Sequence, residues 1–283
     1  MRVSVAKLFG VLLSLSFLLS VTGCSNLSSL FFYPQQQYVR TPHDINLAYE
    51  EVKTVTADGT EINSWFLPAV ENGLENTESP VVLFLHGNAE NISTHIGSVY
   101  WLPEKGVNVL LMDYRGYGHS EGEPYLPAIF QDVESTLIWL RKRFPERKIF
   151  ILGQSIGSAI AATSMAQLKD QYQLSGLILD SSFTSYRSIA QKVTASHVIT
   201  WLVWPFTWLL PTQWDPVEYI ADISPSAILM FHSKEDLVLP FEQGLELFEA
   251  AKAPKQWHTS EGGHIQTFNH EKYRKILLDF LTP

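Results

Sequence analysis

The chain has 283 residues, of which 46% are hydrophobic and 17% charged, and its formal net charge is −9 at pH 7. This composition is typical of a globular protein with one large core. The acidic balance argues against nucleic acid as a partner, because nucleic-acid binding needs a basic surface. Cys24 is the only cysteine, so no disulfide can form within the chain.

The first 23 residues have the layout of a bacterial export signal. Arg2 and Lys7 precede an apolar run over residues 8–19, which is short for a membrane span. Residues 21–24, Val-Thr-Gly-Cys, then resemble the lipobox of bacterial lipoproteins. That resemblance implies cleavage before Cys24 and a diacylglycerol on its sulfur, usually with an N-acyl chain, which together give stable membrane attachment. An ordinary signal peptide, or a short membrane anchor with an incidental cysteine, is the alternative.

Residues 24–48 are expected to form a tether, rich in Ser, Asn, Gln and Pro, with an aromatic patch at 31–34. Ser25 follows the cysteine. In Gram-negative lipoproteins, a residue other than Asp at this place usually implies the outer membrane. We therefore expect a lipid-anchored protein of the bacterial cell envelope, on the periplasmic side of the outer membrane if the cell is Gram-negative. The sequence leaves the oligomeric state open.

From residue 49 onward, strands alternate with helices. Two strands, 49–57 and 61–68, are joined by Asp58-Gly59, a hairpin signal. Apolar runs at 81–87 and 107–116 predict strands buried on both faces. The remaining strands are expected at 148–153, 174–180, 226–233 and 255–260, and the remaining helices at 127–144, 158–169, 241–252 and 272–281. This order predicts an α/β fold with a doubly wound, mostly parallel sheet, whose ligand site lies at the carboxyl ends of the strands.

The stretch ILGQSIGSAIAA, residues 151–162, places Ser155 between a predicted strand and a predicted helix. Gly-x-Ser-x-Gly in this setting is typical of a nucleophile elbow. The turn is so tight that side chains at 153 and 157 would collide with neighbouring backbone. The helix that follows directs its N–H groups toward developing negative charge. A serine that only caps the helix is the alternative interpretation.

With these motifs together, the chain resembles the α/β-hydrolase superfamily over residues 50–283. The matching pieces are HGN at 86–88, DYRGYGHS at 113–120, GQSIG at 153–157, HSKEDLVLP at 232–240 and GGHI at 262–265. The likeness is to small-cap serine hydrolases of bacteria and to eukaryotic esterases and protein depalmitoylases. It implies an eight-stranded-type sheet, a small helical cap and a Ser-Asp-His triad in that chain order, with no metal or organic cofactor.

The resemblance places the catalytic base at His264, in the glycine-rich loop before the last helix. It places the carboxylate that orients the base at Asp236, in the loop after the strand at 226–233. Asp180 is the rival carboxylate, because some hydrolases carry the acid on the preceding strand. In the family, the position of His86 shapes the oxyanion loop without acting as a base, and His232 is expected to be a strand-end residue.

The oxyanion would be stabilised by backbone N–H groups. The family rule gives the residue after the nucleophile, Ile156, and one residue of the loop after the strand at 81–87. Asn88 is the expected second donor, and Ala89 is its alternative.

A tryptophan-rich segment at 198–216 falls where this family inserts its cap, which we expect at about 183–216 of the hydrolase domain 49–283. One interpretation is a buried helix packed over the sheet. The other is an apolar lid or acyl-binding wall, in which Trp201, Trp204 and Trp208 are the pocket candidates and which could touch the bilayer.

The sequence therefore predicts a membrane-tethered serine hydrolase of carboxylic esters or thioesters, including lipid esters, acting through an acyl-enzyme. The first alternative is a serine peptidase or aminopeptidase-like hydrolase. The second is an envelope scaffold or binding lipoprotein that keeps the fold without chemistry.

Overall fold

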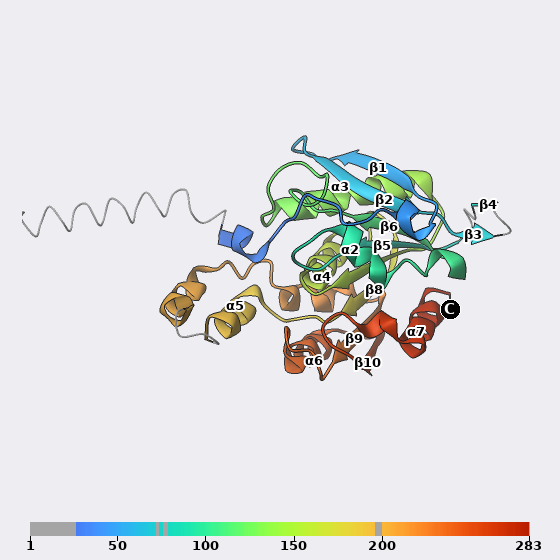
Figure 1. Cartoon of the computed structure of the whole chain (residues 1–283). Coiled ribbons are helices and arrows are strands. Elements are labelled where there is room, and N and C mark those ends of the chain that lie inside the picture. Colours follow the sequence, from blue (N-terminus) through green and yellow to red (C-terminus); the bar gives the residue numbers. More distant parts are fainter. Residues whose placement is uncertain (1–26, 72–73, 76–78, 196–199, 283) are drawn as a thin grey trace, which may run out of the picture.

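The computed structural model describes residues 27–71, 74–75, 79–195 and 200–282 (Figure 1). The predicted signal segment and Cys24 lie outside these ranges. Within them, none of the helices has the length and apolar character needed to cross a bilayer.

Eight strands form one sheet in the order β1-β2-β6-β5-β7-β8-β9-β10. The strands are β1 (Glu50–Val55), β2 (Glu61–Leu67), β5 (Val81–Leu85), β6 (Asn108–Met112), β7 (Ile149–Gln154), β8 (Leu174–Asp180), β9 (Ala227–Ser233) and β10 (Lys255–Ser260). β2 runs antiparallel to β1 and β6, and the other neighbours are parallel. The predicted α/β architecture with a mostly parallel, eight-stranded sheet is confirmed. A separate pair, β3 (Val70–Glu71) and β4 (Leu74–Glu75), lies in the chain between β2 and β5.

Helices cover both faces of the sheet (Figure 1). The α-helices are α2 (Ile92–His95), α3 (Ala128–Arg143), α4 (Ile156–Leu168), α5 (Tyr186–Ala195), α6 (Phe241–Ala250) and α7 (Glu271–Leu281). Short 3₁₀ helices are η1 (Leu27–Phe31), η2 (Pro42–Ile45), η3 (Ile96–Ser98), η4 (Pro103–Lys105), η6 (Pro216–Glu218), η7 (Ile220–Ile223) and η8 (Thr267–Asn269), and η5 (Thr200–Leu209) is longer.

Alternate side chains of each central strand enter two different cores. In β5, Leu83 and Leu85 pack with residues of α3, α4 and α6. Val82 and Phe84 pack on the opposite face with residues of α2, η3 and α7. Since both faces are covered, a central strand must be apolar at every position, and this is why these segments read as continuous hydrophobic runs.

The strand order reverses between β5 and β7. The chain passes from β5 to β6 on one side, then crosses through α3 to β7 on the other side of β5. In an open α/β sheet, the crevice at the carboxyl ends of two such strands is the usual ligand site. His86 follows β5 and Ser155 follows β7, so both lie at this crevice.

The N-terminal segment, residues 27–39, differs from the expected tether because it packs against the domain. Ser28 and Phe32 are buried, and the Ser28 hydroxyl accepts the N–H of Leu126 at 2.9 Å. Further along, the carbonyl of Gln35 accepts the N–H of Gly118 at 2.9 Å. The composition of this segment is that of a linker, but the Phe32 side chain is buried in the core of the domain.

The chain between β8 and β9 holds α5, η5, η6 and η7 and includes the segment predicted as a cap. In η5, Trp204 and Trp208 are exposed, and Trp208 is 59% exposed. The interpretation of 198–216 as a buried helix is therefore wrong for these side chains.

Candidate active site

Ser155 lies on a strained turn between β7 and α4. Its φ is 56° and its ψ is −122°, a region that residues other than glycine seldom occupy. A Cβ at Gly153 would overlap the backbone of Gly157, and a Cβ at Gly157 would overlap the carbonyl oxygen of Leu85. Only glycine therefore lets the elbow approach β5 this closely, which is the physical reason for the two glycines of GQSIG.

The structure brings the predicted triad side chains together from three separate loops. Nε2 of His264 is 2.9 Å from Oγ of Ser155. Nδ1 of His264 is 2.7 Å from Oδ2 of Asp236. A neutral imidazole that donates Nδ1–H to the carboxylate leaves Nε2 to accept the serine proton. The arrangement can therefore activate the hydroxyl as a nucleophile.

Asp236 is held as a carboxylate by its surroundings. Its Oδ1 accepts the N–H groups of Val238 at 2.8 Å and Leu239 at 2.9 Å. Burial by itself would raise the pKa of Asp236, but hydrogen bonds from His232 and His264 and from the Leu239 N–H outweigh it, so the pKa lies well below its usual range. Asp236 thus presents a fixed negative charge to the imidazole.

Asp180, the rival carboxylate, has both oxygens committed elsewhere. Oδ2 accepts the side-chain amide of Gln154 at 2.7 Å, and Oδ1 accepts the Thr267 hydroxyl at 2.6 Å. Burial raises the pKa of Asp180. Its backbone carbonyl accepts the N–H of Ser155 at 3.0 Å. The geometry favours Asp236 as the partner of His264 and gives Asp180 a part in holding the elbow.

Of the two predicted oxyanion donors, Ile156 directly follows the nucleophile and Asn88 lies in the loop after β5. Ile156 is the first residue of α4, where N–H groups have no acceptor within the helix. Across the crevice, Oδ1 of Asn88 accepts three donors: the N–H of Tyr33 at 2.9 Å, the hydroxyl of Tyr117 at 3.0 Å and the N–H of Ala89 at 2.8 Å. Because the Ala89 N–H is directed to this side chain, the backbone N–H of Asn88 is the better candidate for the second donor.

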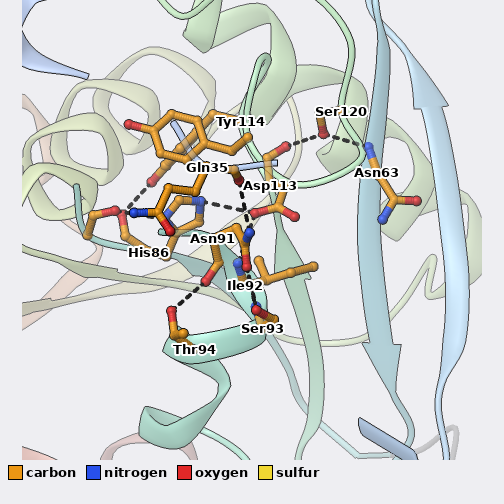
Figure 2. Close-up of polar contacts among 12 residues, drawn as sticks. Gln35, Asn63, His86, Asn91, Ile92, Ser93, Thr94, Asp113, Tyr114 and Ser120 are labelled. Atoms are coloured by element: carbon orange, nitrogen blue, oxygen red, sulfur yellow. Dashed lines mark hydrogen bonds and ion pairs between the residues drawn. The ribbon is translucent and has the colours of Figure 1, made fainter. Parts of the chain in front are cut away.

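A buried polar network joins the loop after β5 to the end of β6 (Figure 2). Oδ1 of Asp113 accepts the N–H of Ile92 at 2.9 Å, and its Oδ2 accepts the Tyr38 hydroxyl at 2.8 Å. Nε2 of His86 is 3.4 Å from Asp113 Oδ1. His86 thus faces this network, in agreement with a role in shaping the loop.

Asn91 connects the same loop to the N-terminal segment. Its side-chain oxygen caps α2 by accepting the N–H of Ser93 at 3.0 Å. Its side-chain nitrogen donates to the carbonyl of Gln35 at 2.9 Å (Figure 2). It also donates to the carbonyl of Gln37 at 2.9 Å. The N-terminal segment therefore buttresses the loop that carries Asn88.

Two contacts at the site were missed by sequence reasoning. His232 is fully buried, with its Nε2 3.5 Å from Oδ2 of Asp236. The only sequence feature that could have indicated this contact is the position of His232 at the end of a predicted strand, four residues before Asp236. The sequence predicted a role for the backbone N–H of Asn88 but none for its side chain. No local pattern indicates that Tyr33 and Tyr117 both donate hydrogen bonds to that side chain.

The tryptophan candidates remain predictions as pocket residues. The side chain of Trp201 is outside the described part of the chain, and Trp208 lies against Arg187, with the guanidinium carbon 5.3 Å from the ring centroid. Among the residues that the structure describes, no group of three or more His, Cys, Asp or Glu side chains is placed to hold a metal ion.

Comparisons with known proteins agree with this fold. The family described as "Serine aminopeptidase, S33" matches residues 77–222, just over half of the chain. The protein YfhR of Salmonella typhi is 33% identical over 267 residues, which are 89% of this chain and 86% of that protein. Lysophosphatidylserine lipase ABHD12 of Danio rerio is 31% identical over 198 residues, covering 67% of this chain and 50% of the lipase.

Among solved structures, the Pyrococcus furiosus esterase PF2001 superposes with a TM-score of 0.70 at 20% identity. The superposition covers 89% of this chain and 97% of the esterase, and at this identity it is evidence of fold alone. The match over residues 77–222 and the identity to YfhR together show that the chain belongs to the serine aminopeptidase S33 family of α/β hydrolases.

Proposed function

We propose that this hydrolase is a serine hydrolase of carboxylic esters or thioesters with an apolar acyl group. The observation that carries the proposal is the Ser155–His264–Asp236 chain of hydrogen bonds, at 2.9 Å and 2.7 Å, on a strained elbow. A hydroxyl, an imidazole and a carboxylate in this order form the acyl-transfer constellation.

In the proposed reaction, Oγ of Ser155 attacks the substrate carbonyl carbon while Nε2 of His264 takes its proton. The N–H groups of Ile156 and Asn88 stabilise the oxyanion. The carbon–oxygen or carbon–sulfur bond then breaks, and His264 returns the proton to the leaving group. Water attacks the acyl-enzyme with His264 again as base, the acid leaves, and Ser155 regains its proton.

The substrate class is supported by the relatives and by the apolar side chains of the chain between β8 and β9. One relative is a lysophosphatidylserine lipase, and a protein of the same fold is an esterase. The chain between β8 and β9 leaves the sheet after Asp180 and carries the tryptophan-rich segment, with Trp204 and Trp208 among its apolar side chains. Apolar surroundings favour an acyl chain over a charged peptide.

We further propose that a lipid on Cys24 tethers the hydrolase to the membrane of the cell envelope, on the evidence of the Val-Thr-Gly-Cys motif. Metabolic labelling with a clickable palmitate analogue tests this, with Cys24→Ser as the control. Label on the native chain and none on the variant would support the anchor, and equal label on both would contradict it.

The first test of the activity is hydrolysis of p-nitrophenyl esters from acetyl to palmitoyl by protein that starts at Ser25, with Ser155→Ala alongside. We expect activity that rises toward medium or long acyl chains, a loss of at least about 10³-fold in the variant, and labelling of Ser155 by a fluorophosphonate. Inert protein that the probe leaves unlabelled would contradict the proposal and favour a binding protein without chemistry.

An aminopeptidase is the second candidate, because the matching family is described as a serine aminopeptidase. It would use the same triad on an amide bond. Hydrolysis of aminoacyl p-nitroanilides that exceeds hydrolysis of every p-nitrophenyl ester, and that requires a free substrate amine, would favour it over the esterase.

A further inference from the structure

One end of the molecule presents a group of large apolar side chains to solvent. They come from the N-terminal segment and from η5, and we call them the apolar apron: Leu30, Tyr33, Trp204, Phe206, Trp208 and Leu209. Leu30 is 66% exposed, and Tyr33, Phe206 and Leu209 are each 64% exposed. Single exposed apolar residues are ordinary, but a contiguous group of this size marks an interaction surface.

Ring and hydrogen-bond contacts hold the two segments next to α5. The Phe31 ring lies 5.2 Å from the ring of Tyr186, the first residue of α5. The next residue, Arg187, donates to the carbonyls of Trp208 at 3.3 Å and Leu210 at 2.9 Å. Figure 1 shows η1 and the α5–η5 pair at the same end of the molecule. The apron residues therefore belong to one surface.

The composition of this surface suits a membrane. Residues 27–39 and 200–213 contain no Asp, Glu, Lys or Arg, although 17% of the whole chain is charged. Aromatic side chains with a polar edge, such as Trp and Tyr, favour the headgroup boundary of a bilayer, while Phe and Leu favour its apolar side. With a net charge of −9, the protein gains nothing from the charge of anionic lipid, so apolar contact would have to provide the attraction.

The start of the described chain lies at the same end. Leu27 begins η1, and Cys24 precedes it by three residues, a distance that extended chain spans in at most about 11 Å. A lipid on Cys24, which is part of the proposed function, would therefore bring this end of the molecule to the bilayer. The insertion that carries η5 leaves the sheet after Asp180, whose carbonyl accepts the N–H of Ser155. The insertion therefore starts at the edge of the sheet that carries the nucleophile, and the N–H of Tyr33, an apron residue, donates to Oδ1 of Asn88 at 2.9 Å.

We propose that the apolar apron docks on the lipid bilayer. Its side chains enter the interfacial layer, and the edge of the sheet that carries Ser155 lies near the membrane. The ester that reaches Ser155 is then an amphiphile held in the bilayer. The proposal rests on the proposed hydrolase only for this last step, because docking itself requires no catalysis.

Flotation with uncharged phosphatidylcholine vesicles tests the docking. The protein starts at Ser25, so it keeps the described contacts and lacks the anchor cysteine. The apron variant is Phe206→Ser with Leu209→Ser. The matched control is Val55→Ser with Ile138→Ser, two exposed apolar residues on β1 and α3. Thermal unfolding of both double variants establishes that they are folded.

We expect the native protein and the control to float with the vesicles, and the apron variant to partition at least tenfold less. Brominated lipid should quench the tryptophan emission of the native protein. Absence of native protein from the floating fraction, or equal flotation of both double variants, would overturn the proposal. So would a dimer in sedimentation that the apron variant abolishes, because the apron would then be an interface between copies.

Two activity assays separate this inference from the proposed function. Both double variants should hydrolyse a soluble short-chain ester at the native rate, and the apron variant alone should lose at least tenfold on a lysophospholipid embedded in vesicles. Inactivity of the native protein on every ester, combined with normal flotation, would refute the hydrolase and leave the docking intact.

Discussion

Asp236 receives the imidazole of His264 on one oxygen and two backbone N–H groups on the other. Hydrogen bonds overcome its burial and hold its pKa well below the usual range. A carboxylate with a depressed pKa is ionised at every pH at which the enzyme would work. The stability that its charge contributes is lost only when the pH falls below the pKa that the group has in the unfolded chain and approaches the lower pKa that it has in the folded protein. Changes in activity near neutral pH must then come from another group.

We expect the acid limb of the kcat/KM profile to have a slope of one, because the depressed pKa of Asp236 keeps this carboxylate from taking up a second proton in that range. Asp236→Asn should lower kcat by about 10⁴-fold, because an amide can hold the imidazole in the wrong tautomer. Ester hydrolysis between pH 4 and 9 measures both. A slope of two, or a variant within tenfold of the native rate, would show that Asp236 is not the orienting carboxylate.

Tyr117 acts at a distance from the reacting atoms, through the side chain of Asn88. Its hydroxyl is one of three donors to Oδ1 of Asn88, whose backbone N–H is the proposed oxyanion donor. Tyr117→Phe removes this bond and also the bond that the hydroxyl accepts from the N–H of Tyr33 at 3.1 Å, so the loop loses part of its support. We expect kcat to fall about 10- to 100-fold with KM little changed, since misplacement of an oxyanion donor weakens the transition state selectively. A changed KM with an unchanged kcat would contradict this.

At the scale of elements, the close approach of α4 to β5 sets the position of the nucleophile. The first turn of α4 meets the carbonyl of Leu85, and a Cβ at Gly157 would overlap it. Backbone of a central strand cannot move aside without disturbing its neighbours in the sheet. The elbow therefore depends on a residue without a side chain at this point.

Gly157→Ala should lower the free energy of unfolding by about 3 kcal/mol or more and abolish ester hydrolysis. Gly97→Ala in η3 is the matched control, because a Cβ there meets no atom within 4 Å. We expect the control to remain within about 1 kcal/mol of the native protein. Urea unfolding of the two variants measures the difference, and equal stabilities would refute the steric argument.

At the scale of the whole molecule, the N-terminal segment links the proposed membrane anchor to the catalytic crevice. Phe32 is 5% exposed and packs in the larger core, and the Tyr38 hydroxyl donates to Asp113. Loss of the segment would expose apolar core surface and leave the Asp113 carboxylate without this donor. The segment is therefore part of the domain in energetic terms.

Protein that starts at Arg40 should have a free energy of unfolding about 3 kcal/mol lower than that of protein that starts at Ser25. Its kcat should also fall, because Asn88 and Asn91 lose partners on the segment. Denaturant unfolding and ester hydrolysis of the two proteins measure these effects. Identical stability and rate would show that the segment is a tether after all.

Much of the fold could be predicted because the relevant information is local. Continuous apolar runs such as 81–85 indicate strands covered on both faces, and the alternation of strands and helices indicates a parallel sheet. The turn at Asp58-Gly59 joins β1 to β2 as expected. The position of Ser155 between a strand and a helix follows from the same local patterns.

The sequence by itself thus determined the class of fold and the residues that could form a triad. Only the tertiary structure decided which groups meet: that Asp236 rather than Asp180 contacts His264, that Tyr33 and Tyr117 converge on Asn88, and that residues 27–39 pack on the domain. The physical reason is that strand and helix patterns arise from the burial of neighbouring residues. Hydrogen bonds between side chains 28 to 109 positions apart depend on how whole elements pack.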